Sequence, residues 1–107
     1  MSLHNTLSSL GLCMRSGNLI SGDFSVSEAI RKHNAHFVIV AEDASDNTKK
    51  KFRNLCSHYQ VPLSIWCSKE QLGHAIGKEF RASIAIVDQG FSDMIRRQLD
   101  KEKSMEV

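Results

Sequence analysis

Residues 36–41 read HFVIVA, a short run of apolar and mostly β-branched side chains. A run of this length and composition is typical of a buried strand. The acidic pair Glu42 and Asp43 follows it, and then come Ser45 and Asp46, residue types that commonly cap the start of a helix. The stretch therefore predicts a buried strand that leads into a helix.

Three more segments have the length and composition of strands. Residues 63–66 and 83–87 (SIAIV) resemble the first strand, and Leu19 and Ile20 predict a very short one. Turn and helix signals separate all of these segments. We therefore expect four strands, and periodicity alone does not give their order.

Five segments have the apolar spacing of amphipathic helices. Their apolar positions are Leu3, Leu7, Leu10 and Met14; Val26, Ala29 and Ile30; Phe52, Leu55, Cys56 and Tyr59; Leu72, Ala75 and Ile76; and Phe91, Met94, Ile95 and Leu99. Ser68 and Gln71 have capping-box spacing, and so have Ser25 and Glu28, although the second helix also fits a start at Asp23. Helices alternating with strands predict an α/β/α sandwich. We expect one domain over residues 1–99 and a polar tail at 100–107 that frays.

Composition narrows the class of protein. The chain has 107 residues, 41% of them hydrophobic, and its net charge of +2 is too small to indicate nucleic-acid binding by itself. Cys13, Cys56 and Cys67 have no metal-ligand spacing, so we expect reduced structural thiols and neither metal nor disulfide. We see no signal peptide and no apolar run that spans a bilayer, which predicts a cytoplasmic protein without a membrane partner.

Two charged clusters each have two interpretations. Glu42 and Asp43 either hold a metal or, more commonly, favour the positive end of the next helix. A basic run at residues 49–53, broken by Phe52, either forms a solvated helix face or contacts phosphate; its cations are Lys49, Lys50, Lys51 and Arg53.

Signals of catalysis are weak. Gly73 and Gly77 lack the strand and glycine pattern of a phosphate loop, so we interpret them as close-packing and helix-end glycines. No two histidines have the HExxH arrangement, and no nucleophile and base can be paired from the sequence. We therefore expect no enzyme activity, no cofactor and no small-molecule substrate.

The chain resembles the L7Ae/L30e superfamily of ribosomal proteins over roughly residues 7–95. The segments that carry the resemblance are residues 37–44 (FVIVAEDA), Leu55-Cys56, Val61-Pro62 and residues 68–77 (SKEQLGHAIG). The bacterial YlxQ-type branch is indicated by Gly11-Leu12, Arg15, Gly17 and residues 47–51 and 88–91. The resemblance implies a mixed four-stranded sheet and binding of structured RNA, commonly a kink-turn.

In the family, RNA meets one edge of the domain through two elements. The first is a glycine turn followed by asparagine, glutamate and, one turn later, lysine. The glycine matches Gly22. In this chain the asparagine position holds Phe24, the glutamate position Ser25 and the lysine position Glu28. The chain departs from the family pattern at these three. The second element is the loop after LGxAxG. The candidate RNA-binding residues are Gly22, Asp23, Phe24, Ser25, Glu28, Lys32, Lys78, Glu79, Phe80 and Arg81.

Three functions are open to a chain with these features. The leading hypothesis is a monomeric, ribosomal-protein-like module that binds structured RNA, with Arg15 and Lys32 adding positive charge near the edge. The second is a protein-interaction adaptor that kept the fold and lost kink-turn readout, since Phe24 neither donates nor accepts a hydrogen bond and Glu28 reverses a charge. The third is a small α/β enzyme, for which the sequence carries no signal.

Overall fold

A computed structural model describes the backbone of residues 2–105 and the side chains of residues 5–102. Helices and strands alternate along the chain, as predicted. In order they are α1 (Ser2–Arg15), β1 (Leu19–Ser21), α2 (Asp23–Arg31), β2 (Phe37–Val40), α3 (Asp46–Tyr59), β3 (Leu63–Ile65), α4 (Lys69–Ala75), β4 (Ser83–Ile86) and α5 (Gln89–Met105).

The four strands form one mixed sheet in the order β1-β4-β2-β3. Strand β4 runs antiparallel to both β1 and β2, whereas β2 and β3 are parallel. The mixed sheet expected from the resemblance is therefore confirmed. The order makes β1 and β3 the two edge strands.

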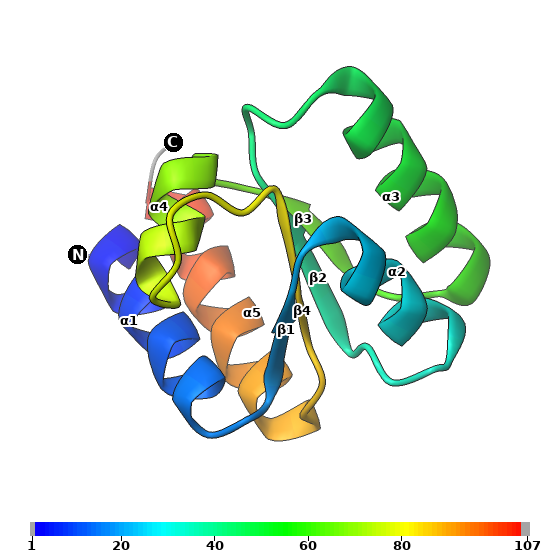
Figure 1. The fold of residues 1–107 in the computed structure, drawn as a ribbon. Helices are drawn as coiled ribbons and strands as arrows, with labels where there is room; N and C mark the ends of the chain where they lie inside the picture. Colours follow the sequence, from blue (N-terminus) through cyan, green and yellow to red (C-terminus); the bar gives the residue numbers. More distant parts are fainter. Residues whose placement is uncertain (1, 106–107) are drawn as a thin grey trace.

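Helices cover both faces of the sheet, as Figure 1 shows: α1, α4 and α5 lie on one side and α2 and α3 on the other. Alternate residues of β2 point to the two layers, because successive side chains of a strand face opposite ways. Phe37 and Ile39 pack with α1, α4 and α5, and Val38 and Val40 pack with α2 and α3. The α/β/α sandwich is confirmed.

Helix α2 begins at Asp23, the earlier of its two predicted starts. Its N-cap is Gly22, and no side chain caps it, so the proposed capping box of Ser25 and Glu28 does not form. Gly22 has a φ of 98°. Glycine reaches this angle without steric cost, and the turn it makes brings the chain into the helix before Ser25.

The last helix extends beyond residue 99, the predicted end of the domain. Helix α5 continues through Asp100 to Met105, and Glu102 is buried, with its carboxylate accepting a hydrogen bond from the hydroxyl of Thr6 in α1. Residues 100–105 are therefore the last part of α5, and residues 106 and 107 lie outside the described residues. The predicted core role of Leu3 also concerns a side chain outside the described ones.

The cysteine side chains belong to the two core layers. Cys13 and Cys67 pack with α1, α4 and α5, Cys56 packs with α2 and α3, and all three are free. Burial raises the pKa of Cys13 and of Cys56 to about 11, with Asp88 adding to the shift at Cys13. Burial, followed by the nearby Glu42, Asp43 and Glu102 carboxylates, raises the pKa of Cys67 to about 12. These thiols are protonated at neutral pH and act as apolar core groups.

Across residues 2–105, no helix combines the length and apolar character that crossing a membrane requires.

Candidate functional site

Hydrogen bonds join the two predicted contact elements into one edge. The N–H of Gly22 donates to the carbonyl of Ser83 at 3.1 Å, and the Ser83 hydroxyl donates to Oδ1 of Asp23 at 2.6 Å. Beside them, Nε of Arg81 donates to the Ser21 hydroxyl at 3.2 Å. The turn before α2 and the loop after α4, about 55 residues apart in sequence, are thus held side by side.

The first turn of α2 presents unpaired donors. Gly22 offers no side chain, so the N–H groups of Asp23, Phe24 and Ser25 have no side-chain acceptor among the described residues. These groups lie at the positive end of the helix dipole. Such an arrangement favours an anionic group, for instance a phosphate, next to the start of the helix.

The loop at residues 77–81 is packed closely against α4. A Cβ on Gly73 would lie 2.5 Å from the carbonyl oxygen of Glu79, so only glycine allows this approach. The Lys78 N–H donates to the Gly73 carbonyl at 2.8 Å, and the Arg81 N–H donates to the Lys69 carbonyl at 3.1 Å. The prediction that Gly73 is a close-packing glycine is confirmed, and the loop is held with its Lys78, Glu79 and Phe80 side chains exposed.

A groove of about 580 Å³ runs along the outer face of α2 toward β1. It brings together four of the predicted residues, Phe24, Ser25, Glu28 and Lys32. Three further residues complete its lining: Ile20, Ala29 and Asn34. The spacing of Phe24, Glu28 and Lys32, four residues apart each time, was a signal for a shared helix face. Nothing in the sequence indicated that Ile20 and Asn34 lie beside that face.

Neighbouring cations partly balance the negative charge in the groove. The Glu28 carboxylate lies 3.6 Å from the Arg31 guanidinium and 3.9 Å from the Lys32 ammonium. Both ion pairs are solvent-exposed, so each is weak and readily exchanges for another partner. The repulsion of phosphate expected from Glu28 is therefore reduced by its two cationic neighbours.

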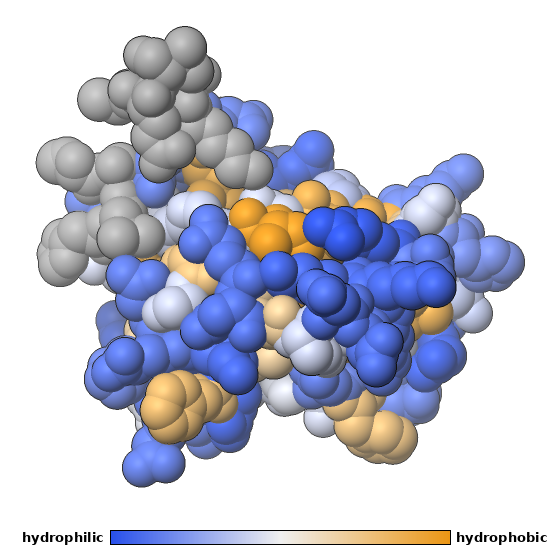
Figure 2. Space-filling model, turned by 90° about the horizontal axis from the view of Figure 1, so that it is seen from above, coloured by the Kyte–Doolittle hydropathy of each residue, from blue (hydrophilic) through white to orange (hydrophobic). Residues whose placement is uncertain are grey.

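Exposed aromatic side chains lie in both contact elements. Among the described residues, the large hydrophobic side chains that are exposed are Phe24 at 77%, Phe80 at 59% and Leu12 at 50%. Figure 2, which views the molecule from above, shows a largely hydrophilic surface on which hydrophobic side chains appear at a few separate places. An exposed phenyl ring in such surroundings is available for stacking or for contact with a partner protein.

Other concavities lie apart from this edge. Arg15, which we placed near the edge, lines a groove of about 280 Å³ between α1 and α4 together with Gly11 and Ala75. Gly11 is buried inside α1, where a Cβ would lie 2.7 Å from the Ala75 carbonyl oxygen. Gly11 therefore allows α1 and α4 to pack closely.

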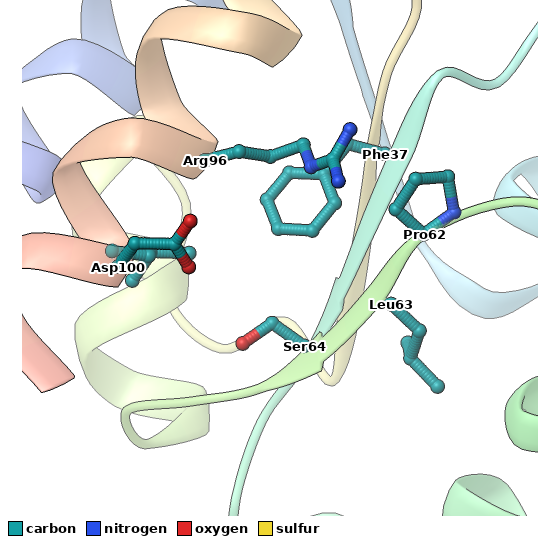
Figure 3. A pocket seen from close by; sticks show the side chains of 7 residues that line it. Phe37, Pro62, Leu63, Ser64, Arg96 and Asp100 are labelled. Carbon is teal, nitrogen blue, oxygen red and sulfur yellow. The ribbon is translucent and has the colours of Figure 1, made fainter.

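A smaller cavity of about 140 Å³ lies at the β3 edge of the sheet, away from α2. The Arg96 guanidinium of α5 lies over the ring of Phe37, 5.9 Å from its centroid, and Pro62 and Ser64 face them across the opening (Figure 3). None of the predicted site residues lines this cavity.

The acidic pair Glu42 and Asp43 lies near the start of α4, and the basic run at residues 49–53 lies on α3. Asp43 accepts a 2.8 Å hydrogen bond from the Lys69 N–H, so it stabilises the start of α4. The sequence instead predicts that it favours the start of α3, the next helix along the chain. The described residues hold no group of three or more His, Cys, Asp or Glu arranged for a metal. The cations of the basic run lie on α3, where Lys50, Lys51 and Arg53 are exposed.

Comparisons with known proteins agree with this fold. A model of the "Ribosomal protein L7Ae/L30e/S12e/Gadd45 family" matches residues 4–96. The chain is 42% identical over 91 residues to "RNA-binding protein YlxQ" of Bacillus subtilis, which covers 85% of this chain and 91% of that protein. It is 33% identical over 96 residues to "Large ribosomal subunit protein eL30" of Tetrahymena thermophila, covering 88% and 92%. A solved structure described as a protein with unknown function from Bacillus halodurans C is similar at a TM-score of 0.86 and 37% identity, covering 89% of this chain and 96% of that one.

Proposed function

Because this chain belongs to the ribosomal protein L7Ae/L30e/S12e/Gadd45 family, in its YlxQ-type branch, we propose that it is an RNA-binding protein. Folded RNA, ribosomal or other, meets the edge formed by residues 22–28 and 78–81. The protein acts as a monomer in the cytoplasm, and the proposal assigns it no catalytic residue, metal or cofactor.

One observation carries the proposal: hydrogen bonds from Ser83 to Asp23 and from Arg81 to Ser21 hold the two contact elements together. The resulting edge combines cationic side chains, the open N–H groups of α2 and two exposed phenyl rings. Cations and N–H groups suit phosphates, and phenyl rings suit unstacked bases. Folded RNA offers both kinds of group at its loops and bends.

Kink-turn recognition is expected to be weak. Asparagine and glutamate side chains read base edges through hydrogen bonds, whereas Phe24 forms none and Ser25 is too short to replace a glutamate. Asp23 lies one position before Phe24, and its Oδ1 is turned toward β4, where it accepts the hydrogen bond of the Ser83 hydroxyl. We therefore propose general recognition of folded RNA with only a slight preference for kink-turns.

A titration at several salt concentrations tests the RNA-binding surface. Fluorescence anisotropy of a labelled RNA hairpin should show that Lys78→Gln with Arg81→Gln weakens binding and lowers the steepness of log K against log salt by about two. The matched control is Lys50→Gln with Arg53→Gln on α3, which removes the same charge from exposed positions outside the edge. Unchanged affinity and slope in the first pair would show that the edge is misplaced.

The exposed phenyl rings also favour the second candidate, a protein-interaction adaptor. An adaptor would bind no RNA hairpin with a salt-dependent affinity, so the same titration distinguishes the two functions.

A further inference from the structure

We infer that the groove along α2 holds one unpaired guanine of the bound RNA, with the Glu28 carboxylate pairing to its Watson–Crick edge. This inference rests on the proposed RNA-binding function and names the nucleotide that the edge selects. It uses the same three positions, Phe24, Ser25 and Glu28, at which the chain departs from the family pattern.

The apolar part of the groove suits the face of a base. Phe24 is 77% exposed, an unusual state for a side chain whose ring gains free energy when covered. Ile20 and Ala29 line the groove beside it. At about 580 Å³, the groove has room for a purine with its ribose. Base stacking on an aromatic ring is a standard way to hold an unpaired nucleotide.

The spacing along α2 places the polar groups at the edge of that base. Phe24 and Glu28 are one turn apart, which separates them by about 6 Å along the helix. A purine stacked on the Phe24 ring therefore extends its edge toward the Glu28 carboxylate. Ser25 and Asn34 also line the groove and supply further hydrogen-bonding groups.

The chemistry of the carboxylate selects guanine. An ionised glutamate only accepts hydrogen bonds, and its two oxygens fit two parallel donors. Guanine has such a pair in its N1–H and N2 amino groups, whereas the Watson–Crick edges of adenine, cytosine and uracil each mix a donor with acceptors. Glu28 is thus complementary to guanine and mismatched with the other three bases.

The cations around Glu28 allow the nucleotide to carry its phosphate. Arg31 and Lys32 lie 3.6 and 3.9 Å from the carboxylate in exposed pairs, so both remain available to solvent and to an incoming anion. Binding of guanine exchanges weak contacts of Glu28 for two charge-assisted hydrogen bonds. The net charge of this part of the groove stays positive.

The test uses three RNA hairpins with the same stem and a seven-nucleotide uridine loop whose central nucleotide is guanosine, inosine or adenosine. Inosine lacks only the N2 amino group of guanosine. The unmodified protein should bind the guanosine hairpin about tenfold more tightly than the inosine hairpin, since one charge-assisted hydrogen bond is lost, and more tightly still than the adenosine hairpin.

Variants assign the preference to the groove. Glu28→Gln should abolish the difference between guanosine and inosine, because the amide presents a donor to the N2 amino group. Phe24→Leu should weaken binding of all three hairpins, because the ring is lost. Phe24→Tyr, which keeps an aromatic ring, should bind them as the unmodified protein does. The control Glu70→Gln, at an exposed position of α4, should keep the preference.

Three outcomes would overturn the inference, and they differ in what else they affect. Equal binding of the three hairpins, or a preference that survives in Glu28→Gln, would overturn the guanine assignment while salt-dependent binding through Lys78 and Arg81 still supports the proposed function. Failure to bind any hairpin would overturn both.

Discussion

The hydroxyl of Ser83 donates a 2.6 Å hydrogen bond to Oδ1 of Asp23, and this bond joins the first residue of β4 to the first residue of α2. Ser83 is fully buried, so its hydroxyl is shielded from bulk solvent. Asp23, predicted from the resemblance as an RNA-binding residue, therefore acts in the structure as a support of the edge.

Replacing Asp23 tests this support. Asp23→Ala leaves the buried Ser83 hydroxyl without its acceptor, so the free energy of unfolding should fall by about 1–2 kcal/mol. Urea denaturation followed by circular dichroism measures the change. Asp23→Asn keeps an oxygen at the same place and should lose less. Equal stability of Asp23→Ala and the unmodified protein would contradict the supporting role.

Gly73 should tolerate no larger residue. In Gly73→Ala the added Cβ lies 2.5 Å from a backbone oxygen of the 77–81 loop, so the loop must move and the protein should lose about 1–3 kcal/mol of stability together with RNA affinity. Gly90→Ala is the control, since its Cβ meets only the Asp88 side chain, at 3.2 Å. Thermal melts of both variants measure stability. Equal melting temperatures would show that the loop is not held by this approach.

The two capping-box spacings show what local sequence determines. At α4 the box forms, with the Ser68 hydroxyl accepting from the Gln71 N–H and the Gln71 side chain accepting from the Ser68 N–H, both at 3.0 Å. At α2 the same spacing of Ser25 and Glu28 forms no box, because Gly22 already turns the chain into the helix. Spacing identifies partners, but the backbone angle that decides where a helix begins depends on the preceding turn.

Long-range contacts explain what the sequence left open. The helix periods and the buried strand at residues 36–41 predicted the layers of the fold, because burial imposes those periods. Periodicity carried no information about the strand order, the Asp43 bond to the Lys69 N–H, or the burial of Glu102 against Thr6. The α2 groove was missed in part for the same reason, since Ile20 and Asn34 reach it from outside the helix.

The buried thiols should make stability fall in alkaline solution. Folding raises the pKa of Cys13 and of Cys56 from 9.0 to about 11 and that of Cys67 to about 12. The unfolded chain therefore releases these protons first, and the stabilisation, complete below pH 9, is lost as pH rises through 11 and 12. Urea midpoints from pH 8 to 11 measure the loss. Cys56→Ala should show a shallower decline; an identical decline would mean that Cys56 does not contribute.

Restoring the family pattern should restore kink-turn recognition. Phe24→Asn, Ser25→Glu and Glu28→Lys together supply the base-reading groups and a cation, and each good bidentate contact is worth about 1–3 kcal/mol of discrimination. The triple variant should bind a kink-turn RNA at least about tenfold more tightly than the unmodified protein does. Titrations of a kink-turn and an unkinked hairpin at one salt concentration measure both affinity and selectivity. Strong selective binding by the unmodified protein, or no gain in the variant, would contradict this assignment of positions.

The measurement that tests the RNA-binding edge most directly is an NMR titration of the isotopically labelled 107-residue chain with an RNA hairpin. The largest amide chemical-shift changes should fall on residues 22–28 and 78–81, with smaller changes at Lys32 and Asn34. Changes centred on the basic residues 49–53 of α3, or on the cavity at Phe37 and Arg96, would contradict this placement of the edge.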